Sequence, residues 1–344
     1  MHDIKTIGIP RGLMAYRDGN MWKQFFELLG YQCIVSGRST KEMLERGMAR
    51  AIDETCLPFK VYLGHVEELL GKCDAIFVPR MGGYKTREKM CTRYEALPDL
   101  IRNIFREEHI QILTVSYDWY TKTDEEKVYM ELGLSLGKSR KEVKKAYGAA
   151  RKYQDGLLRE RERKLWETLE KSGHKSQESS KKQGAKGQEN PKKQGAKDQG
   201  ECRPVILLAG HPYVIHDASM GRELERILKG MGATVLFSDD VEREAALKRS
   251  YHFSKVMPWL INREIVGAVM LLHTKVEGIV LVSAYPCGPD ALVNDMLVRR
   301  IREVPVLQLT LDAQNGTAGL ETRIESFMDI IQYQKAGGYG KNTD

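Results

Sequence analysis

The stretch GIVLVSAYPCGPDALVNDMLVRRIR, residues 278–302, holds one complete repeating unit of the fold. It opens with the apolar run Gly278–Ser283, which is typical of a strand buried on both faces. Pro289–Arg302 then has the pattern of a helix, and a proline in the first helical turn costs no hydrogen bond. The stretch therefore predicts a strand followed by a helix, with Cys287 in the turn between them.

The same alternation of strand and helix recurs in both halves of the chain. The predicted strands are Thr6–Pro10, Gln32–Ser36, Asp74–Pro79, Gln111–Ser116, Val205–Ala209, Thr234–Phe237, Gly278–Ser283 and Val306–Leu311. The predicted helices are Met21–Leu29, Lys41–Ile52, Phe59–Leu70, Leu97–Arg106, Ser219–Met231, Lys255–His273, Pro289–Arg302 and Gly319–Ile331. This pattern predicts an α/β protein with two doubly wound parallel-sheet domains and a cleft between them. Ligands of such sheets bind beyond the carboxyl ends of the strands.

Two capping boxes are expected, one of Ser39 with Glu42 and one of Ser139 with Glu142. The second opens a long charged helix that continues to Glu170. The following segment, Lys171–Glu201, is rich in Lys, Gln, Gly and Ser and has no large apolar residue, so it should be disordered. We expect this helix and insert to be a solvated excursion between the domains. The predicted divisions are 1–138 for the N-terminal domain, 139–201 for helix and insert, 202–334 for the C-terminal domain and 335–344 for a flexible tail.

Composition and charge exclude several classes of protein. The 344 residues are 42% hydrophobic with a net charge of +7, and much of the basic excess lies in the insert. No compact segment combines basic and aromatic residues as nucleic-acid binding requires. The longest apolar run, Ile265–Leu272, is far shorter than the roughly 20 residues of a membrane span. No secretion signal begins the sequence, so we expect a cytoplasmic chain that binds neither membranes nor nucleic acid.

Three of the six cysteines stand where ligands are expected. Cys56 and Cys287 are each followed two positions later by a proline that opens a helix, where the helix dipole favours a thiolate. Cys91 lies in the loop after a predicted strand. No Cys-x-x-Cys pair occurs, which argues against a zinc ribbon or a ferredoxin-type loop. From spacing alone, the three thiols either converge in the cleft or are unrelated loop cysteines. Of the other cysteines, Cys33 and Cys73 fit small buried hydrophobic positions. Cys202 follows the insert and is expected to be an incidental exposed thiol.

Further motifs accompany these cysteines. They are IGIPRGL at 7–13, DETCLPFK at 53–60, GHV at 64–66, FVPR at 77–80, LPD at 97–99, GHPY at 210–213 and CGPD at 287–290. In order and spacing they resemble the acyl-CoA dehydratase activase-related family, also described as the CoA enzyme activase uncharacterised domain. That family is related to the iron–sulfur subunits of 2-hydroxyacyl-CoA dehydratases and to double-cubane cluster proteins.

The resemblance implies two Rossmann-like or flavodoxin-like domains with a [4Fe–4S] cluster between them. The positions that match the family's cysteine motifs are Cys56, Cys91 and Cys287, which would leave the fourth iron open. The resemblance also implies a separate actin-like ATPase activase as electron donor, because this chain lacks the common phosphate-binding loops. Acyl-CoA or another small molecule is the implied substrate, and a homodimer is one assembly that we consider.

The family pattern is incomplete in two places. Thr92 follows Cys91 where the family usually has proline, and residues 312–319 are DAQNGTAG where the family favours the acidic, histidine-bearing DEHTGEAG. Cluster binding is therefore better supported than catalysis. The catalytic candidates are His211, directly after a strand, and Lys60, one turn into a helix.

Other basic side chains have weaker claims. Arg80 and Arg93 are candidates to balance cluster charge or bind a phosphate, and His65 fits a packed histidine.

Three functions remain open at this point. The chain is an oxygen-sensitive electron-transfer protein or enzyme (a lyase or reductase of the dehydratase type), a non-catalytic cluster- or metal-binding module that docks on a dehydratase or its activase, or an α/β ligand-binding protein whose thiols hold zinc or nothing.

Overall fold

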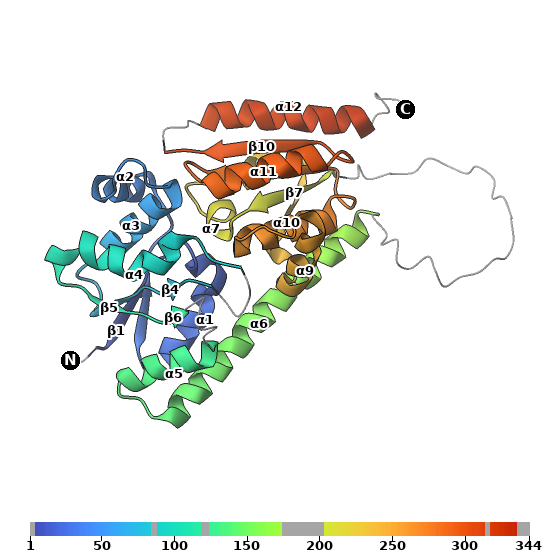
Figure 1. Cartoon of the computed structure of the whole chain (residues 1–344). Coiled ribbons are helices and arrows are strands. Elements are labelled where there is room, and N and C mark those ends of the chain that lie inside the picture. The colour runs from blue at the N-terminus through green and yellow to red at the C-terminus, as the bar shows by residue number, and fades with distance from the viewer. Residues whose placement is uncertain (1–3, 84–87, 118–123, 174–202, 314–316, 336–344) are drawn as a thin grey trace, which may run out of the picture.

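Two four-stranded sheets, in which every strand pair is parallel, form the frame of the molecule (Figure 1). The computed structural model describes residues 4–83, 88–117, 124–173, 203–313 and 317–335. The first sheet has the order β2-β1-β3-β5 and the second the order β10-β9-β7-β8. Their strands are β1 (Thr6–Ile9), β2 (Gln32–Val35), β3 (Ala75–Phe77), β5 (Gln111–Leu113), β7 (Val205–Gly210), β8 (Thr234–Phe237), β9 (Gly278–Ala284) and β10 (Val306–Leu311). The predicted α/β class with two parallel sheets is confirmed.

Helices connect the strands within each sheet. In the first half they are α1 (Ala15–Leu28), α2 (Lys41–Arg50), α3 (Leu57–Leu69), α4 (Thr92–Ile104) and α5 (Glu125–Ser135). In the second half they are α7 (Pro212–Ile215), α8 (Gly221–Gly230), α9 (Arg243–Phe253), α10 (Leu260–Leu272), α11 (Gly288–Arg300) and α12 (Thr317–Lys335). A short parallel pair, β4 (Arg80–Met81) with β6 (Ser116–Tyr117), extends the first half. No helix in the described part of the chain is long and apolar enough to cross a membrane.

The strand order fixes where loops from each sheet meet. In the first sheet the chain leaves β1 toward β2 and later returns to the other side of β1 with β3. The second sheet repeats this around β7, with β8 on one side and β9 on the other. Such reversals open a crevice at the carboxyl ends of the two diverging strands. All residues of β7 and β9 are buried, so the loops that follow them are held on a rigid base.

Some predicted helix limits were wrong. Helix α4 begins at Thr92 rather than Leu97 and keeps Pro98 inside it, although an interior proline removes a backbone hydrogen bond. Helix α10 begins at Leu260 rather than Lys255. Residues 254–257 are not helical, and the carbonyl groups of Ser254, Lys255 and Met257 accept hydrogen bonds from Arg263 instead. Helices α5 and α9 were not predicted.

The long helix α6 (Arg140–Lys171) begins with the predicted capping box of Ser139 and Glu142. It is not the solvated excursion that we expected, since it packs against α1 and α5 at one end and reaches the second half at the other (Figure 1). Its buried side chains are Val143, Ala146, Ala150, Gln154, Leu165 and Leu169. Arg161 forms ion pairs of 2.7 and 2.6 Å with Asp239 and Asp240 in the second half. Because most residues of this helix are charged, its apolar stripe was not recognised in the sequence. The predicted disordered insert lies almost wholly outside the described residues.

A buried polar network also joins the two halves. Ser39 is not the cap of α2, which is Thr40. Instead, the Ser39 hydroxyl contacts His65 Nε2 at 2.9 Å and donates to the buried carboxylate of Asp217 in the second half. Tyr16 donates to the same carboxylate at 2.7 Å. The serine is thus part of the contact between the halves, which a local capping pattern does not reveal.

Candidate functional site

Each of the three cysteines singled out in the sequence occupies the residue immediately before a helix. Cys56 precedes α3, Cys91 precedes α4 and Cys287 precedes α11, and each of these helices has 13 residues. The positions of Cys56 and Cys287 agree with the prediction from the following prolines. Cys91 shares the arrangement, which we missed because α4 was predicted to begin later. Three helix N-termini, with their unpaired N–H groups, therefore accompany the three sulfurs.

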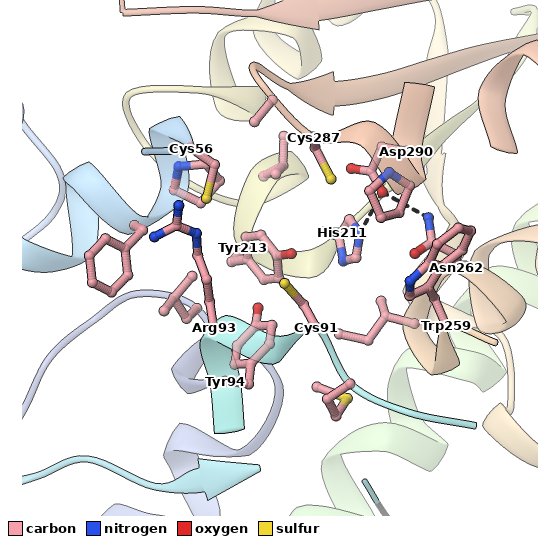
Figure 2. Close-up of a pocket in the computed structure, with 18 of the residues that line it drawn as sticks. Cys56, Cys91, Arg93, Tyr94, His211, Tyr213, Trp259, Asn262, Cys287 and Asp290 are labelled. Carbon is pink, nitrogen blue, oxygen red and sulfur yellow. Dashed lines mark hydrogen bonds and ion pairs between the residues drawn. The ribbon is translucent and has the colours of Figure 1, made fainter. Parts of the chain in front are cut away.

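The three cysteines line one cavity of about 140 Å³ between the two halves of the molecule (Figure 2). Cys56 and Cys91 come from the first half, and Cys287 follows β9 of the second half. Further lining residues include Arg93, Tyr94, His211, Tyr213, Trp259, Asn262 and Asp290. Figure 2 shows the cysteines on different sides of this space, with Tyr94 and Tyr213 among them. Of the two alternatives that spacing left open, convergence in one cavity is the one found.

Backbone hydrogen bonds between the halves hold the cysteine loops in place. The Leu57 N–H, next to Cys56, donates to the Tyr285 carbonyl oxygen at 2.9 Å, two residues before Cys287. On the other side of the cavity, the Lys89 N–H donates to the Pro258 carbonyl at 2.8 Å. The Leu260 N–H donates in turn to the Lys89 carbonyl at 2.9 Å. The relative positions of the cysteines are therefore fixed by main-chain contacts as well as by side-chain packing.

A buried arginine, Arg263, bonds to the segments on both sides of the Lys89 contact. Arg263, whose side chain is 2% exposed, donates through Nε to the Met257 carbonyl at 2.7 Å and through Nη1 to the Ser254 carbonyl at 2.9 Å. Its Nε lies 3.4 Å from the carboxylate of Glu88, which is also buried. The arginine thus ties the non-helical segment before α10 to Glu88, the residue that precedes Lys89. One signal for this role was present in the sequence, namely an arginine near the start of the largely apolar helix LINREIVGAVMLL at 260–272.

The candidate His211 lies in the cavity wall and is oriented by a carboxylate. His211 Nε2 and Asn262 Nδ2 both contact Asp290 Oδ1, at 2.8 and 2.7 Å. Burial acts to raise the pKa of Asp290, but the charge and hydrogen bond of His211 and the hydrogen bond of Asn262 outweigh it and lower that pKa. Asp290 is therefore an ionised acceptor, so His211 Nε2 carries a proton. The buried Nδ1 has no hydrogen-bond partner in the described part of the chain.

Aromatic side chains complete the wall around His211. Its ring stacks on Tyr213 with a centroid distance of 4.8 Å, and Tyr213 in turn lies 6.1 Å from Tyr94. Burial raises the pKa of both phenols well above the ordinary value. Both tyrosines are therefore neutral hydroxyl donors at physiological pH.

Burial decides the protonation of two of the three thiols. It raises the pKa of Cys56, against the lowering effect of the Phe59 N–H and of Arg93. It also raises the pKa of Cys287, and the nearby Asp290 carboxylate adds to that rise. Our expectation that the helix N-termini would favour thiolates is thus wrong for the bare protein at these two positions, because desolvation outweighs the dipole. A bound metal would displace these protons.

The remaining candidates lie in different places. Lys60 donates to the Asp53 carbonyl at 2.9 Å and does not line the cavity. Arg93 does line it, with its guanidinium 5.4 Å from the centre of the Phe59 ring. Arg80 instead pairs with Asp99 at 2.7 Å. Two further predictions concern residues outside the described ranges, namely Cys202 and positions 314–316 of the altered loop. Among the described residues, no group of three His, Cys, Asp or Glu side chains is placed to hold a metal ion.

Comparison with protein-family models matches residues 6–241 to the CoA enzyme activase uncharacterised domain. The chain belongs to this family. The match confirms the resemblance seen in the sequence, and it includes Cys56, Cys91 and His211 but ends before Cys287. No curated protein matches the chain.

Proposed function

We propose that Cys56, Cys91 and Cys287 bind a [4Fe–4S] cluster in the cavity between the two halves. The observation that carries the proposal is the convergence of these three cysteines, each at the start of a helix, on one cavity. They come from segments far apart in the sequence and from both sheets. The chain belongs to the CoA enzyme activase uncharacterised domain family, and the resemblance to that family is what suggested this ligand set.

The size of the cavity and the spread of the thiols fit a cluster better than a single ion. A volume of about 140 Å³ resembles that of an apolar cavity of roughly 150 Å³ that holds benzene, and a cube of four irons and four sulfides is of similar bulk. A zinc ion would bring its sulfur ligands close together, with Zn–S bonds of about 2.3 Å. No such close group exists among the described residues. In a cluster Cys56, Cys91 and Cys287 would each hold a different iron.

Electrostatics support the same assignment. Three thiolates on a [4Fe–4S] core leave a net negative charge. The N-terminal ends of α3, α4 and α11 place partial positive charge beside the three sulfur positions. Arg93 adds a full positive charge in the cavity wall.

When bound, the cluster would supply a one-electron couple and one iron position without a cysteine ligand. The chain's own residues then define what happens next to it. His211 contacts Asp290 through Nε2, and its Nδ1 has no hydrogen-bond partner in the described part of the chain, so Nδ1 is the ring nitrogen left for a further hydrogen bond or a metal. Tyr94 and Tyr213 offer neutral hydroxyl groups. This set suits low-potential electron transfer, or reduction or dehydration of a small substrate such as the acyl end of an acyl-CoA.

A non-catalytic role is the second candidate, and the cavity volume favours it. A cluster would fill most of the 140 Å³, so that only a small part of any substrate has room beside it. In this version the chain is a regulatory cluster-binding module that docks on a dehydratase or on its ATP-dependent activase. The family description, which names CoA enzyme activase, is compatible with either partner.

Anaerobic purification followed by iron, sulfide and EPR measurements tests the proposal. We expect about four irons and four sulfides per chain, with a signal after dithionite reduction. Cys56→Ala, Cys91→Ala and Cys287→Ala should each lose most of the iron. Cys33→Ala and Cys73→Ala are matched controls, since these cysteines lie outside the cavity, and should keep it. Full iron content in Cys287→Ala would refute the ligand set. A second assay distinguishes the two candidate functions: turnover of an acyl-CoA in the presence of an activase would indicate the enzyme, and cluster binding without turnover would indicate the regulatory module.

A further inference from the structure

A second hollow, of about 450 Å³, lies where the loops after β1 and β2 meet α8 of the second half. Four arginines line it, namely Arg11, Arg38, Arg222 and Arg226. Arg11 and Arg38 follow β1 and β2 at the carboxyl edge of the first sheet, where sheets of this class bind ligands. The hollow shares no lining residue with the cysteine cavity.

The charges around this hollow are not balanced. Arg222 pairs with Glu225 at 2.6 Å, and Arg226 pairs with Glu223. Glu223 is the one carboxylate among the described residues that line the hollow. For Arg11 and Arg38, which are both exposed, the described part of the chain provides no carboxylate partner. Two unpaired guanidinium groups at one concave surface attract an anion.

The position of Arg11 is fixed before any ligand arrives. Its Nε donates to the Ser36 carbonyl at 3.1 Å, and its backbone N–H donates to the Ser36 hydroxyl at 2.7 Å. Ser36 is itself buried and contacts His65 at 3.0 Å. These bonds hold the guanidinium and leave its two terminal nitrogens for another acceptor. A guanidinium presented in this way matches the oxygen spacing of a phosphate group.

We propose that this hollow binds the phosphate groups of a small phosphorylated molecule, with Arg11 and Arg38 as the principal ligands and Arg222 on the opposite side. Its volume exceeds that of one phosphate and lies within the range of small-molecule sites. A diphosphate, with charge spread over two groups, meets arginines from both halves at once. The site is independent of the cysteine cavity, so it stands or falls separately from cluster binding.

Calorimetric titration of the full chain with pyrophosphate, inorganic phosphate and ADP at constant ionic strength tests this site. We expect pyrophosphate to bind one per chain. Arg38→Gln should weaken it at least about tenfold, since hydrogen bonds between charged partners are the strong ones. Arg11→Gln should do the same. Because Arg11 also contacts Ser36, the exposed Arg38 provides the variant that does not disturb the fold.

The matched control is Arg163→Gln on α6, an exposed arginine already paired with Glu160 and Glu167, which should bind like the unmodified chain. Tighter binding of ADP than of pyrophosphate would identify a nucleotide-like ligand, and equal binding of inorganic phosphate would identify a monophosphate; both support the site. Absence of heat with all three probes at millimolar concentration would overturn it. Equal affinity in Arg38→Gln and Arg163→Gln would overturn it as well.

Discussion

Replacing Arg263 by methionine should destabilise the protein strongly. The substitution keeps the apolar volume but removes a guanidinium that is 2% exposed and lies 3.4 Å from the Glu88 carboxylate. Removing one partner of a buried ion pair costs about 3–5 kcal/mol. The Tyr251 hydroxyl also contacts Glu88 and still satisfies part of that carboxylate, so we expect a loss near the lower limit, about 3 kcal/mol.

Urea denaturation of the apo protein measures this loss as a change in the free energy of unfolding. Arg299→Met is the control, because its side chain is 77% exposed in an i,i+4 pair with Asp295, and exposed pairs contribute at most about 1 kcal/mol. Adding Glu88→Gln to Arg263→Met should recover part of the stability, since it removes the buried charge that faced the guanidinium group. A loss below about 1 kcal/mol for Arg263→Met, or no recovery in the double variant, would refute the reasoning.

Two further predictions concern the contacts that join the helices and the halves. Burial lowers the pKa of His65 to about 4, so the unfolded chain, with a histidine pKa of about 6.5, binds a proton first as the pH falls. The free energy of unfolding should therefore drop by about 3 kcal/mol between pH 6.5 and pH 4. In His65→Gln, urea denaturation over this pH range should lack this drop. If the free energies of both proteins fell equally with pH, the assignment would be wrong. Gly267→Ala should destabilise strongly, because its Cβ would lie 1.7 Å from the Ala246 carbonyl oxygen. Gly148→Ala has open space around it and should instead stabilise α6 by about 0.5–1 kcal/mol; thermal unfolding that ranks the two the other way would show that the α9–α10 contact is not rigid.

The strands were predictable because burial on both faces leaves an unmistakable signal. β7 and β9 are continuous apolar runs, and no neighbouring element had to be known to place them. Helix starts were less predictable, since Pro98 concealed the first turns of α4 and thus the helix that begins after Cys91. The contacts of Ser39 could not be predicted from the sequence. The local pattern of Ser39 and Glu42 is that of a capping box, but the serine hydroxyl bonds instead to Asp217, which is far away in the sequence.

The same distinction applies to the candidate site. Cys56 and Cys287 could be selected from local motifs, whereas the pairing of His211 with Asp290 depends on the loop after β7 meeting the start of α11. The pKa of the thiols could not be predicted from the sequence either. A helix N-terminus acts to lower a thiol pKa, but burial acts to raise it, and the burial that raises the pKa of Cys287 is a property of the assembled cavity.

The family match ends before the last residues of the candidate site, and this difference indicates which part of the chain is needed for function. The match ends at residue 241, yet the third cysteine is Cys287 and the Leu57 N–H that follows Cys56 is bonded to the Tyr285 carbonyl. A fragment that stopped at residue 241 would therefore lose a thiol and also the hydrogen bond at the start of α3. Because each half supplies cysteines and the bonds that position those of the other half, neither half by itself contains the proposed cluster site.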